Sequence, residues 1–189
     1  KTLHSIDSSI TSSFNIHITL KTILDELVSH IKADAANIIL FNSHMNTFEI
    51  ASRTGFKFKT KINATPRAQA GLASLAAQQQ TVLYIEDLTD NALYHSGFID
   101  DGENFISYYG FPLYIKGELL GVLEIYHRSH LKLNEENSEF FQTLATQTAI
   151  AIDNHSMFDN LQKTNKDLQL AYETTLEGWS AALDLRDKE

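Results

Sequence analysis

Seven side chains between residues 84 and 109 combine flat aromatic rings with polar groups, which are the parts of a small-molecule binding site. Rings can stack on a flat ligand, and a carboxylate or an imidazole can hold it by a hydrogen bond. Each residue also has an ordinary structural interpretation. The aromatic ones can fill the core or anchor a loop, and Asp87 can end a strand and cap the next turn. The seven candidates are Tyr84, Asp87, Tyr94, His95, Phe98, Tyr108 and Tyr109.

The charge of this segment restricts what it can bind. From Glu86 to Glu103 the chain carries six carboxylates and no lysine or arginine. Such a segment repels a phosphate group, so a cyclic nucleotide is disfavoured, and a neutral or cationic small molecule, or no ligand at all, fits better. The whole chain has 15 Lys and Arg against 24 Asp and Glu, a net charge of −9, and is therefore a poor candidate for binding nucleic acid.

Residues for catalysis or metal binding are not arranged in a recognisable pattern. There is no Gly-rich phosphate loop and no G-x-S-x-G sequence, and Asp100 and Asp101 are adjacent rather than a spaced acid/base pair. His127 and His130 are three apart at a strand exit and face opposite sides unless the chain turns there, so a shared metal is disfavoured. A single histidine could ligate a haem, and His95 is the least implausible, but nothing in the sequence raises it far above the other seven. We predict no catalytic residues and no metal site within this chain.

Cysteine is absent, which excludes disulfides, thiolate metal sites and a cysteine nucleophile. No apolar run approaches 18 residues, so nothing in the sequence is expected to span a membrane. The lack of cysteine suits a reducing compartment, and we expect a cytoplasmic protein.

The elements that would position these residues are a mixture of helices and strands. Apolar residues at helical spacing predict a helix over 15–33, with a shorter helix over 3–13 before it. Strands are predicted at 37–41, 48–51, 56–62 and 82–85, with an Ala-rich helix over 67–79 between the last two. The strongest β signal is a hairpin in which 105–115 and 118–127 flank the turn Lys116-Gly117. These segments predict an α+β fold with an antiparallel sheet of about six strands and helices on one face.

From Asn134 onward the sequence predicts a long helix that contains one glycine and no proline. About 50 helical residues span roughly 75 Å, more than a small domain can cover. From Phe158 to Tyr172 the seam residues are spaced alternately three and four apart, which favours a coiled coil and a parallel homodimer. Asn165 on the seam would fix the register, and Gly178 marks a plausible break. The predicted dimer helix presents Phe158, Leu161, Asn165, Leu168, Tyr172 and Leu176.

The order of these elements resembles a GAF domain over roughly residues 15–158. The match depends on Ala70-Gly71-Leu72-Ala73, on Tyr84-Ile85-Glu86-Asp87 and, most specifically, on the run Gly110 to Ile125 (GFPLYIKGELLGVLEI). The resemblance implies a GAF-like sheet whose pocket lies between the sheet and the loops after the small helix, where the seven candidates would meet. It implies a sensor over 1–158, followed by a signalling helix over 159–189.

That family implies a regulatory domain that dimerises and relays a small-molecule or redox signal to an output domain in the same chain. The alternative is a pure dimerisation or linker module with no ligand. The cofactor is unknown, but without cysteine a covalently attached bilin and the cysteine-dependent sulfoxide reductase activity of some GAF proteins are disfavoured. Residues 175–189 (TLEGWSAALDLRDKE) resemble the lead-in to an HD-GYP domain, which implies a bacterial cyclic di-GMP phosphodiesterase as the output.

Overall fold

The structure is a computed structural model that describes residues 2–58, 71–95, 99 and 101–186. Four α-helices, one 3-10 turn and five strands follow one another in these residues. In chain order they are α1 (Thr2–Ile31), β1 (Ala35–Asn42), β2 (Thr47–Thr54), α2 (Leu72–Gln79), β3 (Leu83–Ile85), α3 (Ala92–His95), η1 (Asp101–Glu103), β4 (Ser107–Ile115), β5 (Glu118–His127) and α4 (Glu135–Arg186).

The five strands form one antiparallel sheet in the order β2-β1-β5-β4-β3. The predicted hairpin is confirmed: β4 and β5 flank the turn Lys116-Gly117, where both residues have a positive φ. β1 and β5, which are far apart in sequence, pair at the centre of the sheet. About six strands were predicted, and five are found in the described part of the chain. Residues 56–58, at the start of the remaining predicted strand, form no strand, and 59–62 lie outside the described residues.

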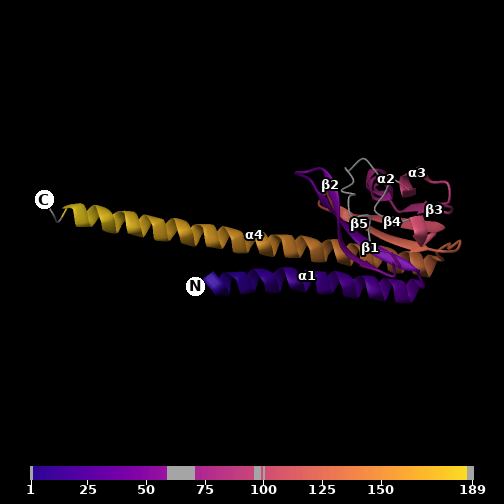
Figure 1. Cartoon of the computed structure of the whole chain (residues 1–189), viewed down its shortest axis with the longest axis horizontal. Helices are drawn as coiled ribbons and strands as arrows, with labels where there is room; N and C mark the ends of the chain where they lie inside the picture. Colours follow the sequence, from indigo (N-terminus) through magenta and orange to yellow (C-terminus); the bar gives the residue numbers. More distant parts are fainter. Residues whose placement is uncertain (1, 59–70, 96–98, 100, 187–189) are drawn as a thin grey trace.

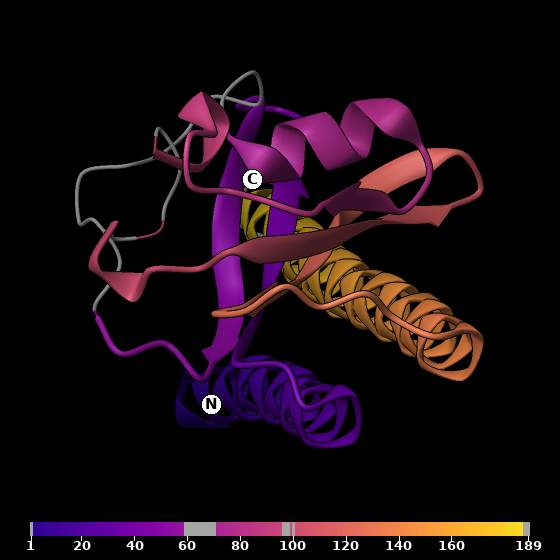
Figure 2. The ribbon, with the colours of Figure 1, turned by 90° about the vertical axis from the view of Figure 1, so that its right-hand side faces the viewer.

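Helices cover both faces of the sheet (Figure 2). The two long helices, α1 and α4, lie against one face, and their apolar residues, such as Leu24 and Phe141, form a core with Ile38, Leu123 and Ile125 of the strands. The short helices α2 and α3 lie over the other face, where a second core collects the opposite side chains of the same strands. Because side chains alternate along a strand, neighbouring residues of β4 and β5 enter different cores.

The long helices run side by side in opposite directions, and α4 continues far beyond the sheet (Figure 1). Near the sheet they are joined by a stacked ring pair, His30 on Phe140, with 3.8 Å between centroids. Two sequence-based predictions were wrong in detail. The helices predicted over 3–13 and 15–33 are one helix, α1, which ends at Ile31, and α4 passes through Gly178 without a break. In the described part of the chain, no helix is both long enough and apolar enough to cross a membrane.

Candidate functional site

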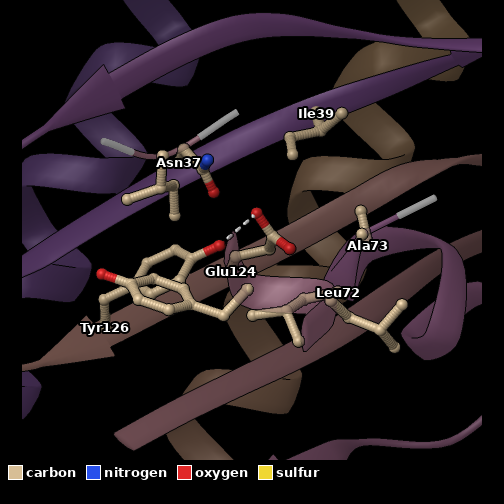
Figure 3. Close-up of a pocket in the computed structure, with 10 residues that line it drawn as sticks. Asn37, Ile39, Leu72, Ala73, Glu124 and Tyr126 are labelled. Carbon is tan, nitrogen blue, oxygen red and sulfur yellow. Dashed lines mark hydrogen bonds between the residues drawn. The ribbon is translucent and has the colours of Figure 1, made fainter. Parts of the chain in front are cut away.

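A small cavity lies between the sheet and the short helices, on the face opposite α1 and α4. Its sheet side is formed by Asn37, Ile39, Glu124 and Tyr126, and its outer side by Gly71, Leu72, Ala73, Leu93, Tyr94 and Ile99 (Figure 3). The cavity has a volume of about 20 Å³. That volume holds about one water-sized group. Most of the lining is apolar, so the few polar groups decide what can bind.

The central polar group is Glu124, in the middle of β5, whose side chain is 1% exposed. Side chains alternate along a strand, so Glu124 lies on the same face of β5 as Val122 and Tyr126. It therefore points toward the cavity and away from the long helices. Tyr108 donates a hydrogen bond to one carboxylate oxygen at 2.7 Å, and Tyr126 donates to the other at 2.9 Å (Figure 3 draws the second). Gly110 leaves room for Tyr108, since a Cβ there would come within 2.2 Å of the Tyr108 hydroxyl.

Burial dominates the acid–base chemistry of this cluster. Removal from water disfavours a charged carboxylate and raises the pKa of Glu124 to about 7, although hydrogen bonds from Tyr108, Tyr126 and Asn37 act in the opposite direction. The same burial, with the nearby carboxylate, raises the pKa of both tyrosines well above its usual range, so they remain hydrogen-bond donors. The Glu124 carboxyl therefore changes its protonation state near neutral pH rather than near pH 4.5.

Asn37, on the inner strand β1, completes the polar wall. Its side chain is 1% exposed and acts to lower the pKa of Glu124, and its Oδ1 oxygen has no hydrogen-bond partner. A buried acceptor without a partner costs free energy and indicates a group that a ligand or a water could satisfy.

We compared the sequence of the chain with models of protein families. The family model described as a GAF domain matches residues 15–153. The chain belongs to the GAF domain family. The match covers most of the chain, including the sheet, the cavity and the first part of α4.

Solved structures similar to this GAF domain show the same fold at low sequence identity. The GAF domain of a phosphoenolpyruvate-protein phosphotransferase from Coxiella burnetii is 21% identical, with a TM-score of 0.65, covering 84% of this chain and 94% of that one. A type II free methionine-R-sulfoxide reductase from Thermoplasma acidophilum is 16% identical, with a TM-score of 0.63, covering 76% and 96%. The GAF domain of a two-component sensor histidine kinase from Bacillus halodurans is 19% identical, with a TM-score of 0.57, covering 74% and 97%. No curated protein sequence matches the chain.

The structure places the predicted pocket residues in different parts of this GAF domain. Tyr94 lines the cavity, and Tyr108 reaches it through Glu124. Tyr84 and Tyr109 stack on each other at 4.4 Å between ring centroids, in contact with the core of the long helices on the opposite face of the sheet. The Tyr109 hydroxyl accepts a hydrogen bond from the Leu133 N–H, which fixes the chain just before α4.

The remaining candidates lie outside the cavity lining or outside the described residues. Asp87 accepts hydrogen bonds from the backbone N–H and the hydroxyl of Thr89, which is the turn-capping role that its position suggested. These bonds lower the pKa of Asp87. His95 is exposed, and one of its ring nitrogens lies 3.1 Å from the Thr89 carbonyl oxygen. Phe98 lies outside the described residues. Among the side chains that the structure describes, no group of three or more His, Asp or Glu is arranged to hold a metal.

Three residues of the polar wall, Asn37, Glu124 and Tyr126, were not among the sequence candidates. A signal for them existed. Glu124 and Asn37 are polar residues within short apolar runs, at positions whose alternate neighbours are apolar and face inward. A charge in such a place is costly to bury, so it indicates a site or a paired group.

A second buried carboxylate, Glu103, has a structural explanation. It accepts backbone N–H bonds from Lys57 and Phe58 at 2.7 Å each, and it forms an ion pair with Arg128. The Arg128 backbone N–H donates to Asp34, which follows α1. This network ties the segment after β2 to the sheet and to the end of α1, and it satisfies the Glu103 charge.

Proposed function

We propose that this GAF domain is a regulatory or sensory module that detects a small molecule in the cavity beside Glu124 and transmits the signal along α4. The observation that carries the proposal is the continuity of α4. One helix packs on the back of the sheet that forms the cavity and then extends to Arg186. A change in the sheet at β5 therefore has a rigid route out of the domain.

The distal half of α4 supports a proposed homodimer. Its large apolar side chains Phe158, Leu161, Leu168, Tyr172 and Leu176 are between 45% and 69% exposed, and nothing in the described chain covers them. Phe158, Leu161, Asn165, Leu168 and Tyr172 are spaced alternately three and four apart, the pattern of a coiled-coil seam. A second copy of the helix in parallel covers this seam and pairs Asn165 with its equivalent, which specifies register at a cost in stability.

Sedimentation of the purified chain tests the dimer. The wild type is expected to sediment as a dimer at micromolar concentration. The double variant Leu161→Lys/Leu168→Lys is expected to be monomeric, because it places like charges on the seam. Asn160→Lys/Leu170→Lys adds the same charge to the same turns but off the seam, and it should remain dimeric. A wild-type monomer, or equal behaviour of both variants, would contradict the proposal.

The relay itself is tested in the natural full-length protein. A single-residue insertion near Lys166 rotates everything after it by about 100° relative to the seam, whereas a seven-residue insertion nearly restores the phase. Output activity should change far more with one residue than with seven. Similar effects of the two insertions would exclude a rigid helical relay.

For the output, we propose an HD-GYP-type phosphodiesterase acting on cyclic di-GMP, supported by the resemblance of residues 175–189 alone. The full-length protein should then hydrolyse cyclic di-GMP in the presence of a divalent metal, and failure to do so would contradict this part only. In the same proposal, the chain described here supplies regulation and no catalytic residues.

A dimerisation or linker module without a ligand is the second candidate. The observation that favours it is the cavity volume of about 20 Å³, which is too small for a whole metabolite. A thermal-shift screen of small molecules separates the two, because a ligand that binds the folded state raises the apparent stability by mass action. Stabilisation that is lost on changing Asn37 or Glu124 supports sensing, and no stabilisation by any compound supports the linker module.

A further inference from the structure

The polar wall of the cavity offers mostly hydrogen-bond acceptors. The hydroxyl protons of Tyr108 and Tyr126 are both directed to Glu124. What remains toward the cavity is the unpartnered Oδ1 of Asn37 and the unused lone pairs of the carboxylate. A carboxylate can accept about four hydrogen bonds, more than these donors supply.

A primary ammonium group is the chemical complement of such a wall, since it has three N–H donors, one positive charge and no acceptor. We propose that the cavity binds the protonated amino group of a small amine, with Glu124 as its counter-ion and Asn37 Oδ1 as a second acceptor. This deepens the proposed function, because it assumes that the cavity is the sensory site and names the class of ligand.

The size and the remaining lining agree with this class. An ammonium group is close in size to a water molecule, which is what 20 Å³ accommodates. Leu72, Leu93 and Ile99 line the same cavity and supply apolar contacts for a group as small as the methyl of methylammonium. A phosphate or carboxylate ligand would instead meet the Glu124 charge and an unpaired acceptor, with no counter-charge among the lining residues.

Charge pairing supplies the selectivity. A buried carboxylate without a counter-ion is costly, and burial accordingly raises the pKa of Glu124 to about 7. An ammonium group that pairs with it favours the ionised form, so binding releases a proton from the fraction of molecules in which Glu124 is protonated. Affinity is therefore expected to rise with pH and to level off above about 7.

The other titratable groups near Glu124 keep their protonation state over this range. Tyr108 and Tyr126 on the sheet titrate well above pH 10. Tyr126 also interacts electrostatically with Tyr94 of α3 and with Arg53 of β2. The positive charge of Arg53 lowers the pKa of Tyr126. Arg53 stays protonated at these pH values even though burial lowers its pKa. The pH dependence near 7 thus belongs to Glu124.

Calorimetric titration of the purified chain with methylammonium chloride tests the proposal, with ammonium chloride as a second probe. Saturable binding is expected, about tenfold weaker at pH 6 than at pH 8. Tetramethylammonium, which has the charge but no N–H donor, should not bind. If tetramethylammonium or potassium binds as well as methylammonium, the site recognises charge alone and the proposal is overturned. It is equally overturned if none of the amines binds.

Variants locate the site. Glu124→Gln should lose at least tenfold in affinity at pH 8 and lose the pH dependence. Asn37→Ala should weaken binding severalfold while keeping the pH dependence, which tests the site even if Glu124→Gln folds poorly. Glu118→Gln removes the same charge from an exposed position of the same strand and should bind like the wild type. Unchanged affinity in both cavity variants would overturn the proposal. If amines fail but another compound stabilises the chain through Asn37 or Glu124, only this inference fails and the sensory proposal stands.

Discussion

The two faces of the sheet are built from alternate residues of the same strands, yet they differ in chemistry. Against α1 and α4 the strands present apolar side chains such as Ile38, Leu123 and Ile125, and a large hydrophobic cluster is buried there. Against α2 and α3 they present Asn37, Glu124 and Tyr126 around a cavity. One face stabilises the fold and holds the long helices, and the other retains polar groups at a cost in stability.

The two faces also differ in how they can respond to a ligand or a proton. A densely packed apolar face transmits small displacements, because its side chains have few alternative arrangements. A buried carboxyl with a pKa near 7 and an acceptor without a partner can change state when a proton or a ligand arrives. Placing both on β1 and β5, the central strands, couples them through the backbone.

The largest effect is expected from truncation on the helix face. Phe141→Ala should lower the free energy of unfolding by about 3–5 kcal/mol, because the ring is 1% exposed and its removal leaves a cavity in close-packed surroundings. Chemical denaturation measures it. Phe140→Ala is the matched control on the same helix. Its ring is only half-buried and stacks on His30, so a loss of about 1–2 kcal/mol is expected. Equal losses would show that the burial of the Phe141 ring does not decide the cost of its removal.

The next largest effect is the pH dependence of the stability, which we expect from Glu124 on the cavity face. Glu124 has a folded-state pKa of about 7 against an ordinary value of 4.5, so between these values the folded state holds more protons than the unfolded one. Its contribution to stability is therefore complete below about pH 4.5 and is lost as the pH rises through 7. The size of the loss is about 3 kcal/mol, from a shift of about 2.5 pKa units at 1.36 kcal/mol each.

Comparison with Glu124→Gln isolates this contribution. The stability of the variant relative to the wild type should increase by about 3 kcal/mol between pH 4.5 and pH 8, since the amide does not titrate. Glu118→Gln, on an exposed position of β5, should show no such trend. A flat difference between wild type and Glu124→Gln over this range would mean that the carboxyl is ionised at neutral pH and that the two faces differ less than the structure indicates.

The sequence predicted well those parts of the fold that depend on local pattern. The β4–β5 hairpin follows from two apolar runs around a glycine turn, and α4 follows from helical spacing without proline. The prediction of a strand from Phe56 failed at residues 56–58, although these residues alternate. Lys57 and Phe58 donate their backbone N–H groups to Glu103, 45 or more residues away, and this long-range contact has no local signal.

The candidate site was predicted less well, because successive side chains of a strand point to opposite faces of the sheet. Tyr108 and Tyr109 are neighbours in sequence and were grouped together, but the pleat sends one to the cavity and the other to the helix face. Asn37 and Glu124 are 87 positions apart in the sequence, and only the pairing of β1 with β5 brings them to one wall. Which face holds the cavity depends on where α2 and α3 pack, and strand periodicity does not contain that information.

The smallest effect expected, and the sharpest test of the two faces, is the pair Tyr108→Phe and Tyr109→Phe. Both remove one hydroxyl from adjacent residues of β4. Tyr108→Phe takes a donor from a buried carboxylate and should cost about 1.5–3 kcal/mol at pH 8, whereas Tyr109→Phe removes an acceptor from the Leu133 N–H and should cost about 0.5–1.5 kcal/mol. Because the Tyr108 bond lowers the pKa of Glu124, its loss should move the NMR titration of the Glu124 carboxyl to higher pH. The Tyr109 variant should leave that titration unchanged, since its hydroxyl lies on the other side of the sheet. A shift in both variants would show that the sheet does not insulate its two faces.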